Sequence, residues 1–177
     1  MDFTLKPIST SGIPGALAKV SHYRYLNQAE EAESICRDVI AADPENQIAQ
    51  RMLALVLTDQ FNGTSADRYA ETESIASRLT DSYERQYYMG IVHERRAKAQ
   101  LLAGHQPHTL LVLFEEAMRC FGEAEKIRPK GNDDAILRWN RCARIIQSLP
   151  THHWKGKGQG ESEMFESGDN PPVPAKH

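Results

Sequence analysis

Apolar residues recur every three or four positions along most of the chain, and this period places them on one face of a helix. Ala32, Cys36 and Val39 follow it in one stretch, and Trp139 and Cys142 follow it in another. We identify no strand. The period predicts an all-α fold with helices over residues 15–27, 29–42, 47–60, 66–80, 82–103, 107–127 and 132–149.

The ends of these predicted helices carry residues that start or stop a helix. Pro14 fits a first turn, because the N–H that proline lacks has no partner there. Pro44 ends the second helix, since the residue before a proline is pushed out of the helical conformation. Asn46 is suited to cap the third helix, and the charge of Asp134 suits the start of the last one.

The chain divides into three parts. Residues 1–12 are polar and rich in Ser and Thr, and they predict an extended lead-in. Residues 13–149 hold all of the periodic stretches and predict one helical domain. Residues 150–177 change abruptly to Gly, Ser, Pro and charged residues. Such a segment cannot bury enough apolar surface to offset the cost of ordering its backbone, so we expect a disordered tail.

Composition narrows the class of protein. The chain has 177 residues, of which 25% are charged, and its net charge is −3. A groove for nucleic acid usually shows a basic excess, which is lacking overall. The N-terminus has no basic region followed by an apolar core, as a secretory signal would. The longest apolar runs, residues 52–57 and 110–114, are far short of the roughly 20 residues of a membrane span. We expect a cytoplasmic protein.

The three cysteines, Cys36, Cys120 and Cys142, are far apart and form no CxxC motif. An odd number without pairing spacing favours a reducing compartment. Each cysteine lies on an apolar helical stripe. We therefore expect three small buried side chains, and not a metal site or a catalytic thiol.

Two predicted hairpins share one spacing, in which a small residue is followed after four positions by a larger apolar residue and after twelve by a proline. The residues are Ala32, Cys36 and Pro44 in the first hairpin, and Ala117, Phe121 and Pro129 in the last. This spacing resembles the tetratricopeptide repeat, a 34-residue helix–turn–helix unit. The resemblance covers about residues 14–149. It implies an α-solenoid of about three hairpins that is closed by the helix at 132–149.

The repeats are not regular. Two repeats would separate Ala32 from Ala117 by 68 residues, whereas the separation is 85. The second repeat has Ser74 and Ser82 where the family has an aromatic residue and a proline. Small residues such as Gly90 stand where the family brings two helices close together, and larger residues are expected to fill the remaining space.

The resemblance also implies a concave groove that takes an extended peptide or a partner's helix. The positions that line it in the family correspond here to Leu17, Ser21, Arg24, Arg51, Leu55, Thr58, Tyr87, Ile91, Glu94 and Arg95. Members that grip a C-terminal carboxylate use Lys and Asn there, and Leu17, Ser21 and Leu55 do not reproduce that clamp. The arginines can bind carboxylates bidentately. Alternatively, these residues form an ordinary solvated face.

The sequence contains no arrangement typical of catalysis. His93, followed by Glu94, has no partner at hydrolase or metal spacing, and it stands where the family has an inner Tyr, so we expect a packed histidine. His105 and His108 share a loop, but a metal site needs three or four ligands. We expect no metal, no cofactor and no enzymatic activity.

The last predicted helix carries three arginines, Arg138, Arg141 and Arg144, beside the apolar residues Trp139, Cys142 and Ile146. A terminal helix of a solenoid needs one polar outer face, and we assign the arginines to it. The stripe could instead bind RNA, in which case the affinity would fall steeply with salt.

The leading hypothesis is a protein–protein interaction module, a scaffold, adaptor or chaperone, that binds a peptide or helix of another protein in its groove. One alternative is an RNA-binding helical repeat that uses the arginine stripe. Another is a structural protein that assembles through its ends. Met164 and Phe165, in the tail, could also form a short docking motif or fold back into the groove.

Overall fold

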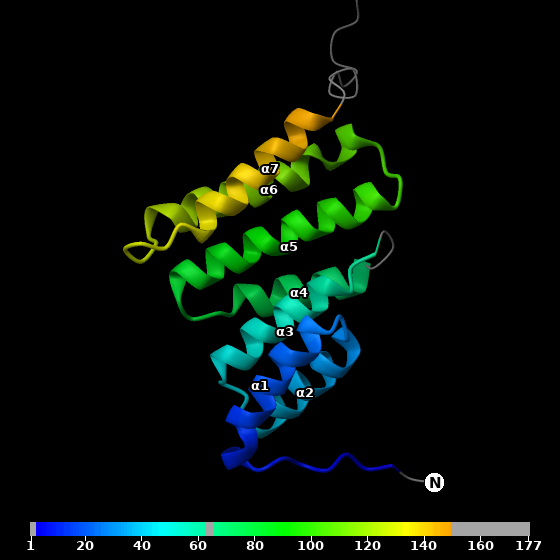
Figure 1. The fold of residues 1–177 in the computed structure, drawn as a ribbon, viewed down its shortest axis with the longest axis vertical. Helices are drawn as coiled ribbons and strands as arrows, with labels where there is room; N and C mark the ends of the chain where they lie inside the picture. Colours follow the sequence, from blue (N-terminus) through cyan, green and yellow to red (C-terminus); the bar gives the residue numbers. More distant parts are fainter. Residues whose placement is uncertain (1–2, 63–65, 150–177) are drawn as a thin grey trace, which may run out of the picture.

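The computed structural model of the chain describes residues 3–62 and 66–149. Within these ranges the protein is all-α, as predicted, and its helices pack in the order of the sequence (Figure 1). A 3-10 turn, η1, precedes seven α-helices. Their bounds are η1 Thr10–Gly12, α1 Ile13–Tyr25, α2 Ala29–Ala42, α3 Gln47–Asp59, α4 Ala66–Ser77, α5 Ser82–Leu102, α6 Pro107–Lys126 and α7 Asp134–Ser148.

The helix bounds agree with the hydrophobic period to within three residues, and those of α2 agree fully. Pro14 lies in the first turn of α1, as predicted. Asn46 caps α3, because its side-chain Oδ1 accepts a 2.9 Å hydrogen bond from the backbone N–H of Ala49. Asp81 caps α5 in the same way. The predicted tail, residues 150–177, lies outside the described residues.

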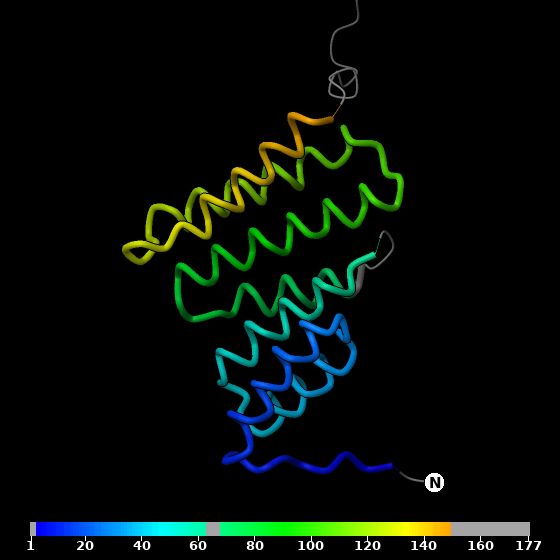
Figure 2. Tube along the Cα trace, in the orientation of Figure 1, coloured from blue at the N-terminus to red at the C-terminus, as the bar shows by residue number. Residues whose placement is uncertain are grey.

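The chain advances from one end of the molecule to the other (Figure 2). The pair α1 and α2 occupies one end, and α6 and α7 occupy the other. Each helix packs against the next, and contacts also join α1 to α3, α3 to α5 and α5 to α7. The odd-numbered helices therefore form a connected row. No helix of the described residues is long and apolar enough to cross a membrane.

The core between α5 and α6 depends on one close approach. Phe121 on α6 is fully buried against Gly90 on α5. A Cβ atom at Gly90 would lie only 2.5 Å from Cε1 of Phe121, closer than real Cβ contacts come. The ring of Tyr87 lies 6.0 Å from that of Phe121, centre to centre. The predicted role of Gly90, to let two helices approach, is confirmed.

The core among α1, α2 and α3 is built from smaller side chains. Val20, Ala32, Cys36, Val56 and Leu57 are fully buried there. Cys36, Cys120 and Cys142 are all buried and unpaired, as predicted. Burial raises the pKa of the thiols of Cys36 and Cys142 to about 12, so both are held as neutral, weakly reactive groups.

The face that α7 turns to the core differs from the predicted one. Ala135, Cys142 and Ile145 are buried, and Arg138 is half-buried between them, whereas Trp139 is 40% exposed. The assignment of Arg138 to the outer face and of Trp139 to the buried stripe is therefore wrong. The reason is Glu94 on α5. Its carboxylate is fully buried, and such a charge must be paired with cations, which Arg138 and, on the same helix, Lys98 supply.

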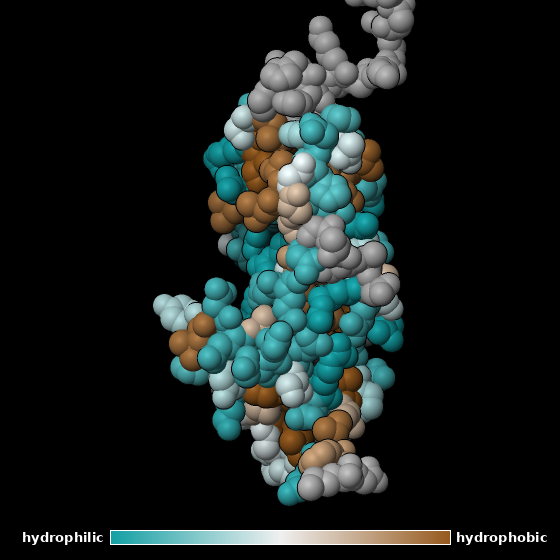
Figure 3. Space-filling view, turned by 90° about the vertical axis from the view of Figure 1, so that its right-hand side faces the viewer, coloured by the Kyte–Doolittle hydropathy of each residue, from teal (hydrophilic) through white to brown (hydrophobic). Residues whose placement is uncertain are grey.

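Hydrophobic and hydrophilic surfaces are unevenly distributed. On the side drawn in Figure 3, hydrophilic surface covers most of the middle of the molecule, and hydrophobic surface shows toward both ends. The exposed large apolar side chains are Phe3, Leu5, Tyr25, Leu26, Ile48, Leu102, Val112, Ile127, Leu137 and Trp139. Single exposed apolar side chains are normal in soluble proteins and carry no functional argument by themselves.

Candidate functional site

Three of the predicted groove residues meet around one carboxylate in the row of odd-numbered helices. Nε of Arg24, on α1, donates to Oδ2 of Asp59, on α3, at 2.7 Å. Arg95, on α5, donates to Oδ1 of the same carboxylate and, at 3.0 Å, to the hydroxyl of Thr58. The sequence reasoning selected Arg24, Thr58 and Arg95 but missed Asp59, since a single acidic residue at the end of a helix gives no distinctive signal.

A second ion pair in the row joins Arg51 on α3 to Glu84 in the first turn of α5. Both side chains are partly exposed, at 30% and 26%. Glu84 was also missed, because it is 33 positions from Arg51 and its position suits the helix dipole whether or not a cation is near.

Glu94 lies deeper than a groove residue would. Its carboxylate is fully buried and is paired with Lys98 on the same helix and, at 3.3 Å, with Arg138 on α7. Burial by itself lowers the pKa of Arg138, but Glu94 and Tyr87 outweigh that effect and raise the pKa above its usual value. Arg138 therefore stays charged and ties α7 to α5.

The ten predicted groove residues differ in exposure. Ser21 is exposed, and Thr58, Ile91 and Glu94 are buried and offer almost no surface. Arg24 and Arg95 share one carboxylate, whereas a guanidinium has five N–H donors, so both keep donors for other acceptors. The half-buried members of the set are Leu17, Arg24, Arg51, Leu55, Tyr87 and Arg95.

His93 is packed as predicted. Its ring is buried, and its Nδ1 lies 2.9 Å from the hydroxyl of Tyr69 on α4. The guanidinium of Arg96 lies 3.7 Å from the centre of the Tyr69 ring, in a cation–π contact. Burial lowers the pKa of His93, and the nearby carboxylates of Glu73 and Glu116 oppose that shift only partly. The histidine is therefore held neutral between α4 and α5.

The arginine stripe of α7 is not one surface. Arg138 is half-buried and paired with Glu94, whereas Arg141 and Arg144 are exposed. Arg138 is paired with a fully buried carboxylate, whereas Arg141 and Arg144 lie in no ion pair within the described residues. Within residues 3–62 and 66–149, no group of three or more His, Cys, Asp or Glu side chains is placed to hold a metal ion.

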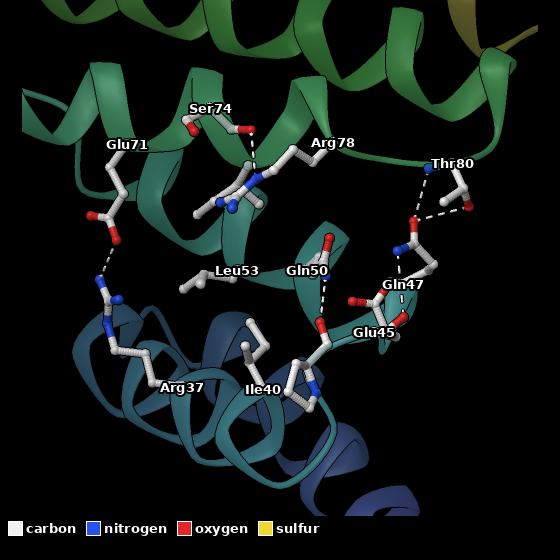
Figure 4. Close-up of a pocket in the computed structure, with 12 residues that line it drawn as sticks. Arg37, Ile40, Glu45, Gln47, Gln50, Leu53, Glu71, Ser74, Arg78 and Thr80 are labelled. Atoms are coloured by element: carbon white, nitrogen blue, oxygen red, sulfur yellow. Dashed lines mark hydrogen bonds and ion pairs between the residues drawn. The ribbon is translucent and has the colours of Figure 1, made fainter.

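The sequence reasoning missed a cleft between α2 and α4, with residues of α3 in its lining (Figure 4). Its volume is about 500 Å³. An ion pair of 2.9 Å between Arg37 on α2 and Glu71 on α4 spans one end. Beside it, Glu33 accepts hydrogen bonds from Arg37, Gln60 and Arg68. The helical period pointed only to the apolar residues, and the space between two helices that are not neighbours in sequence has no local pattern.

Comparison with protein-family models, with curated proteins and with solved structures finds no significant match to this chain. What the molecule offers to a ligand is therefore argued from its own geometry. Two surfaces stand out, the ion-paired row of odd-numbered helices and the cleft between α2 and α4.

Proposed function

We propose that the chain is a tetratricopeptide-like α-solenoid. Two features support this proposal. First, contacts between alternate helices join the odd-numbered ones into a row, as stacked hairpins require. Second, the close packing of Gly90 against Phe121 uses a small residue and an aromatic residue where the family resemblance expects them. The α7 helix then closes the stack.

We infer that the protein is an interaction module and that its row of odd-numbered helices binds an acidic peptide or helix of another protein. The observation that carries this proposal is the presence of Arg24, Arg51 and Arg95 on three successive helices of the row. Each is about a quarter to a third exposed and is paired with a carboxylate of similar exposure. Together they place three cations and two carboxylates on the row.

A ligand can replace the ion pairs in the row with only a small loss of stability. Pairs between partly exposed side chains contribute little to stability, typically about 0–1 kcal/mol, because water already solvates both partners. A carboxylate of an incoming peptide can therefore share or replace Asp59 and Glu84. A bidentate contact to a guanidinium then adds direction as well as charge. This mechanism concerns binding, and no step of it requires catalysis.

The test is a selection of peptides from a random phage-displayed library on the immobilised full chain. Binding of the enriched peptides is then measured by fluorescence anisotropy. We expect the selected peptides to be rich in Asp and Glu. The triple variant Arg24→Gln/Arg51→Gln/Arg95→Gln should bind them at least about tenfold more weakly, since it loses several charge-assisted contacts.

The matched control removes three arginines elsewhere, in the variant Arg119→Gln/Arg141→Gln/Arg144→Gln. It has the same net charge as the triple variant, so it separates a defined site from general electrostatic attraction. Full affinity is expected for the control. Equal losses in both variants, or the selection of peptides without an acidic bias, would show that the row is not the binding surface.

A further inference from the structure

We propose that the cleft between α2 and α4 binds a small organic carboxylate that carries an apolar chain. The cleft places an arginine without an acidic partner, Arg78, beside a floor of buried aliphatic side chains. The lining of the cleft includes residues of α3 but none of Arg24, Arg51 and Arg95, so this proposal does not depend on the function proposed above.

The floor of the cleft is apolar. Leu53 on α3 and Ile75 on α4 are 3% and 7% exposed, and Ile40 on α2 is half-buried beside them. The volume of about 500 Å³ lies within the range of about 300–1,000 Å³ that is typical of small-molecule sites. An aliphatic chain laid on this floor would remove its own apolar surface and the exposed part of Ile40 from water, which is favourable.

Arg78, directly after α4, supplies the charge. Its side chain runs back along α4, with the guanidinium facing the cleft (Figure 4). Nε donates to the backbone carbonyl of Ser74 at 3.2 Å. Among the described residues, no carboxylate lies within ion-pair distance of Arg78, although Arg37 in the same cleft pairs with Glu33 and Glu71. The terminal nitrogens of Arg78 are therefore available to an anion.

Gln47 and Gln50, two other polar side chains of the cleft, are hydrogen-bonded to neighbouring residues. Oε1 of Gln47 accepts hydrogen bonds from the backbone N–H and the hydroxyl of Thr80, at 2.9 and 3.1 Å. Nε2 of Gln50 donates to the carbonyl of Pro44 at 2.7 Å. These contacts hold the end of the cleft that lies away from the pair between Arg37 and Glu71 (Figure 4). Arg78 differs from Arg37, the other arginine of the cleft, in lying in no ion pair among the described residues.

Charge also sets the orientation of the ligand. Glu45 is exposed at the same end as Gln47 and repels an anion from there. A carboxylate is therefore expected at the guanidinium of Arg78, whose planar fork can bind both oxygens. The apolar chain then lies over Leu53. A ligand with a positive head would be repelled by Arg78.

The first experiment uses octanoate as the probe, because it combines a carboxylate with a short aliphatic chain. The full chain, labelled with ¹⁵N, is titrated and followed by two-dimensional NMR. We expect saturable shifts of backbone amides in α2, α3 and α4, with a Kd on the order of 1 mM or tighter, as befits a ligand of this size. Octanol and octylamine, which have the same chain but a neutral or a cationic head, should bind at least about tenfold more weakly.

Variants then identify which side chain binds the carboxylate of octanoate. Arg78→Gln should weaken octanoate binding about tenfold, the effect expected for loss of one charge-assisted contact. Arg144→Gln, which removes an exposed arginine outside the cleft, should leave the affinity unchanged. Glu45→Gln should leave it unchanged or raise it. Ser74→Trp, a substitution at an exposed position of the wall, should fill the cleft and abolish binding whatever the role of Arg78.

Each result either supports or overturns the proposal. Arg78 is exposed, and its side chain makes one hydrogen bond within the described residues, so its variant should fold, and circular dichroism checks this. Equal affinity of octanoate for wild type and Arg78→Gln would overturn the role of the arginine. Absence of saturable shifts in the cleft, or equal binding of octylamine, would overturn the site or its preference for an anion.

Discussion

The two halves of the molecule fill the space between their helices in different ways. In the half formed by α5, α6 and α7, a buried ring, Phe121, fits against the bare backbone of Gly90. In the half formed by α1 to α4, smaller side chains fill the core, and α2 and α4 are joined partly by ion pairs such as Arg37 with Glu71. A cleft lies beside those ion pairs.

The difference shows which contacts in each half can change. Apolar packing against Gly90 leaves no room for another atom, so that half should tolerate little change in side-chain volume. Ion pairs that are partly exposed exchange with water and with ligands at small cost. Both of the surfaces proposed for binding accordingly contain ion pairs of this kind, and neither includes Phe121.

The largest expected effect is a decrease in the free energy of unfolding when one large side chain in each core is replaced by alanine. Phe121→Ala should lower it by about 3–5 kcal/mol, because the change leaves a closed cavity. Leu53→Ala should lower it by about 2 kcal/mol, because Leu53 borders the cleft and the loss does not leave a closed cavity. Urea unfolding followed by circular dichroism measures both. A greater loss for Leu53→Ala would reverse the comparison between the halves.

The next effect tests the fit between the glycine and the ring. Gly90→Ala should lower the free energy of unfolding by about 1–2 kcal/mol, although alanine favours the helix, since its Cβ would overlap the ring of Phe121. With Phe121→Leu in the same chain the added Cβ gains room, and the two losses should sum to more than the loss in the double variant. Additive losses in the same urea assay would show that the two sites do not interact.

A smaller effect is expected in the ion-paired half. Burial by itself raises the pKa of Glu33, but hydrogen bonds from Gln60, Arg37 and Arg68 outweigh burial, and the pKa lies below its usual 4.5. Glu33→Gln should therefore lower the free energy of unfolding by about 1 kcal/mol at pH 7. This contribution should be lost in wild type as the pH falls below 4.5, because the folded protein must then also take up the proton.

The matched control for Glu33 is Glu123→Gln. Glu123 pairs with one residue, Lys126, at 2.7 Å, and both side chains are largely exposed. Its loss should change the free energy of unfolding by less than about 0.5 kcal/mol. If both variants lowered the free energy of unfolding by the same amount, the carboxylate of Glu33 would contribute no more than an ordinary surface carboxylate.

The smallest expected effect is a pH dependence of the free energy of unfolding that comes from His93, which lies between α4 and α5, where the two halves meet. The pKa of His93 is lowered by burial, so the unfolded chain takes up a proton first as the pH falls through 6.5. The free energy of unfolding should therefore decrease from pH 7 toward pH 5, and His93→Gln should remove that component. Unfolding curves of wild type and variant at each pH measure it. Parallel curves would mean that the histidine titrates alike in both states.

The period of apolar residues was sufficient to predict the helices, because burial of one face is a local property of the sequence. It predicted α2 fully and also the cap at Asn46. The arginines of the row could be selected from the family resemblance, but their acidic partners could not. Asp59 and Glu84 are more than 30 positions from the arginines they meet, and no local pattern links residues at that separation.

The sequence by itself determined that this protein is helical, that its cysteines are buried, and the bounds of its helices to within three residues. Only the tertiary structure decided which charged groups on different helices are paired. Arg138 lies inward and Trp139 outward because a carboxylate on another helix, Glu94, is buried and requires a cation. The cleft between α2 and α4 likewise exists only where two helices distant in sequence come together. Periodicity reports which residues avoid water, but pairing and empty space depend on the arrangement of several helices at once.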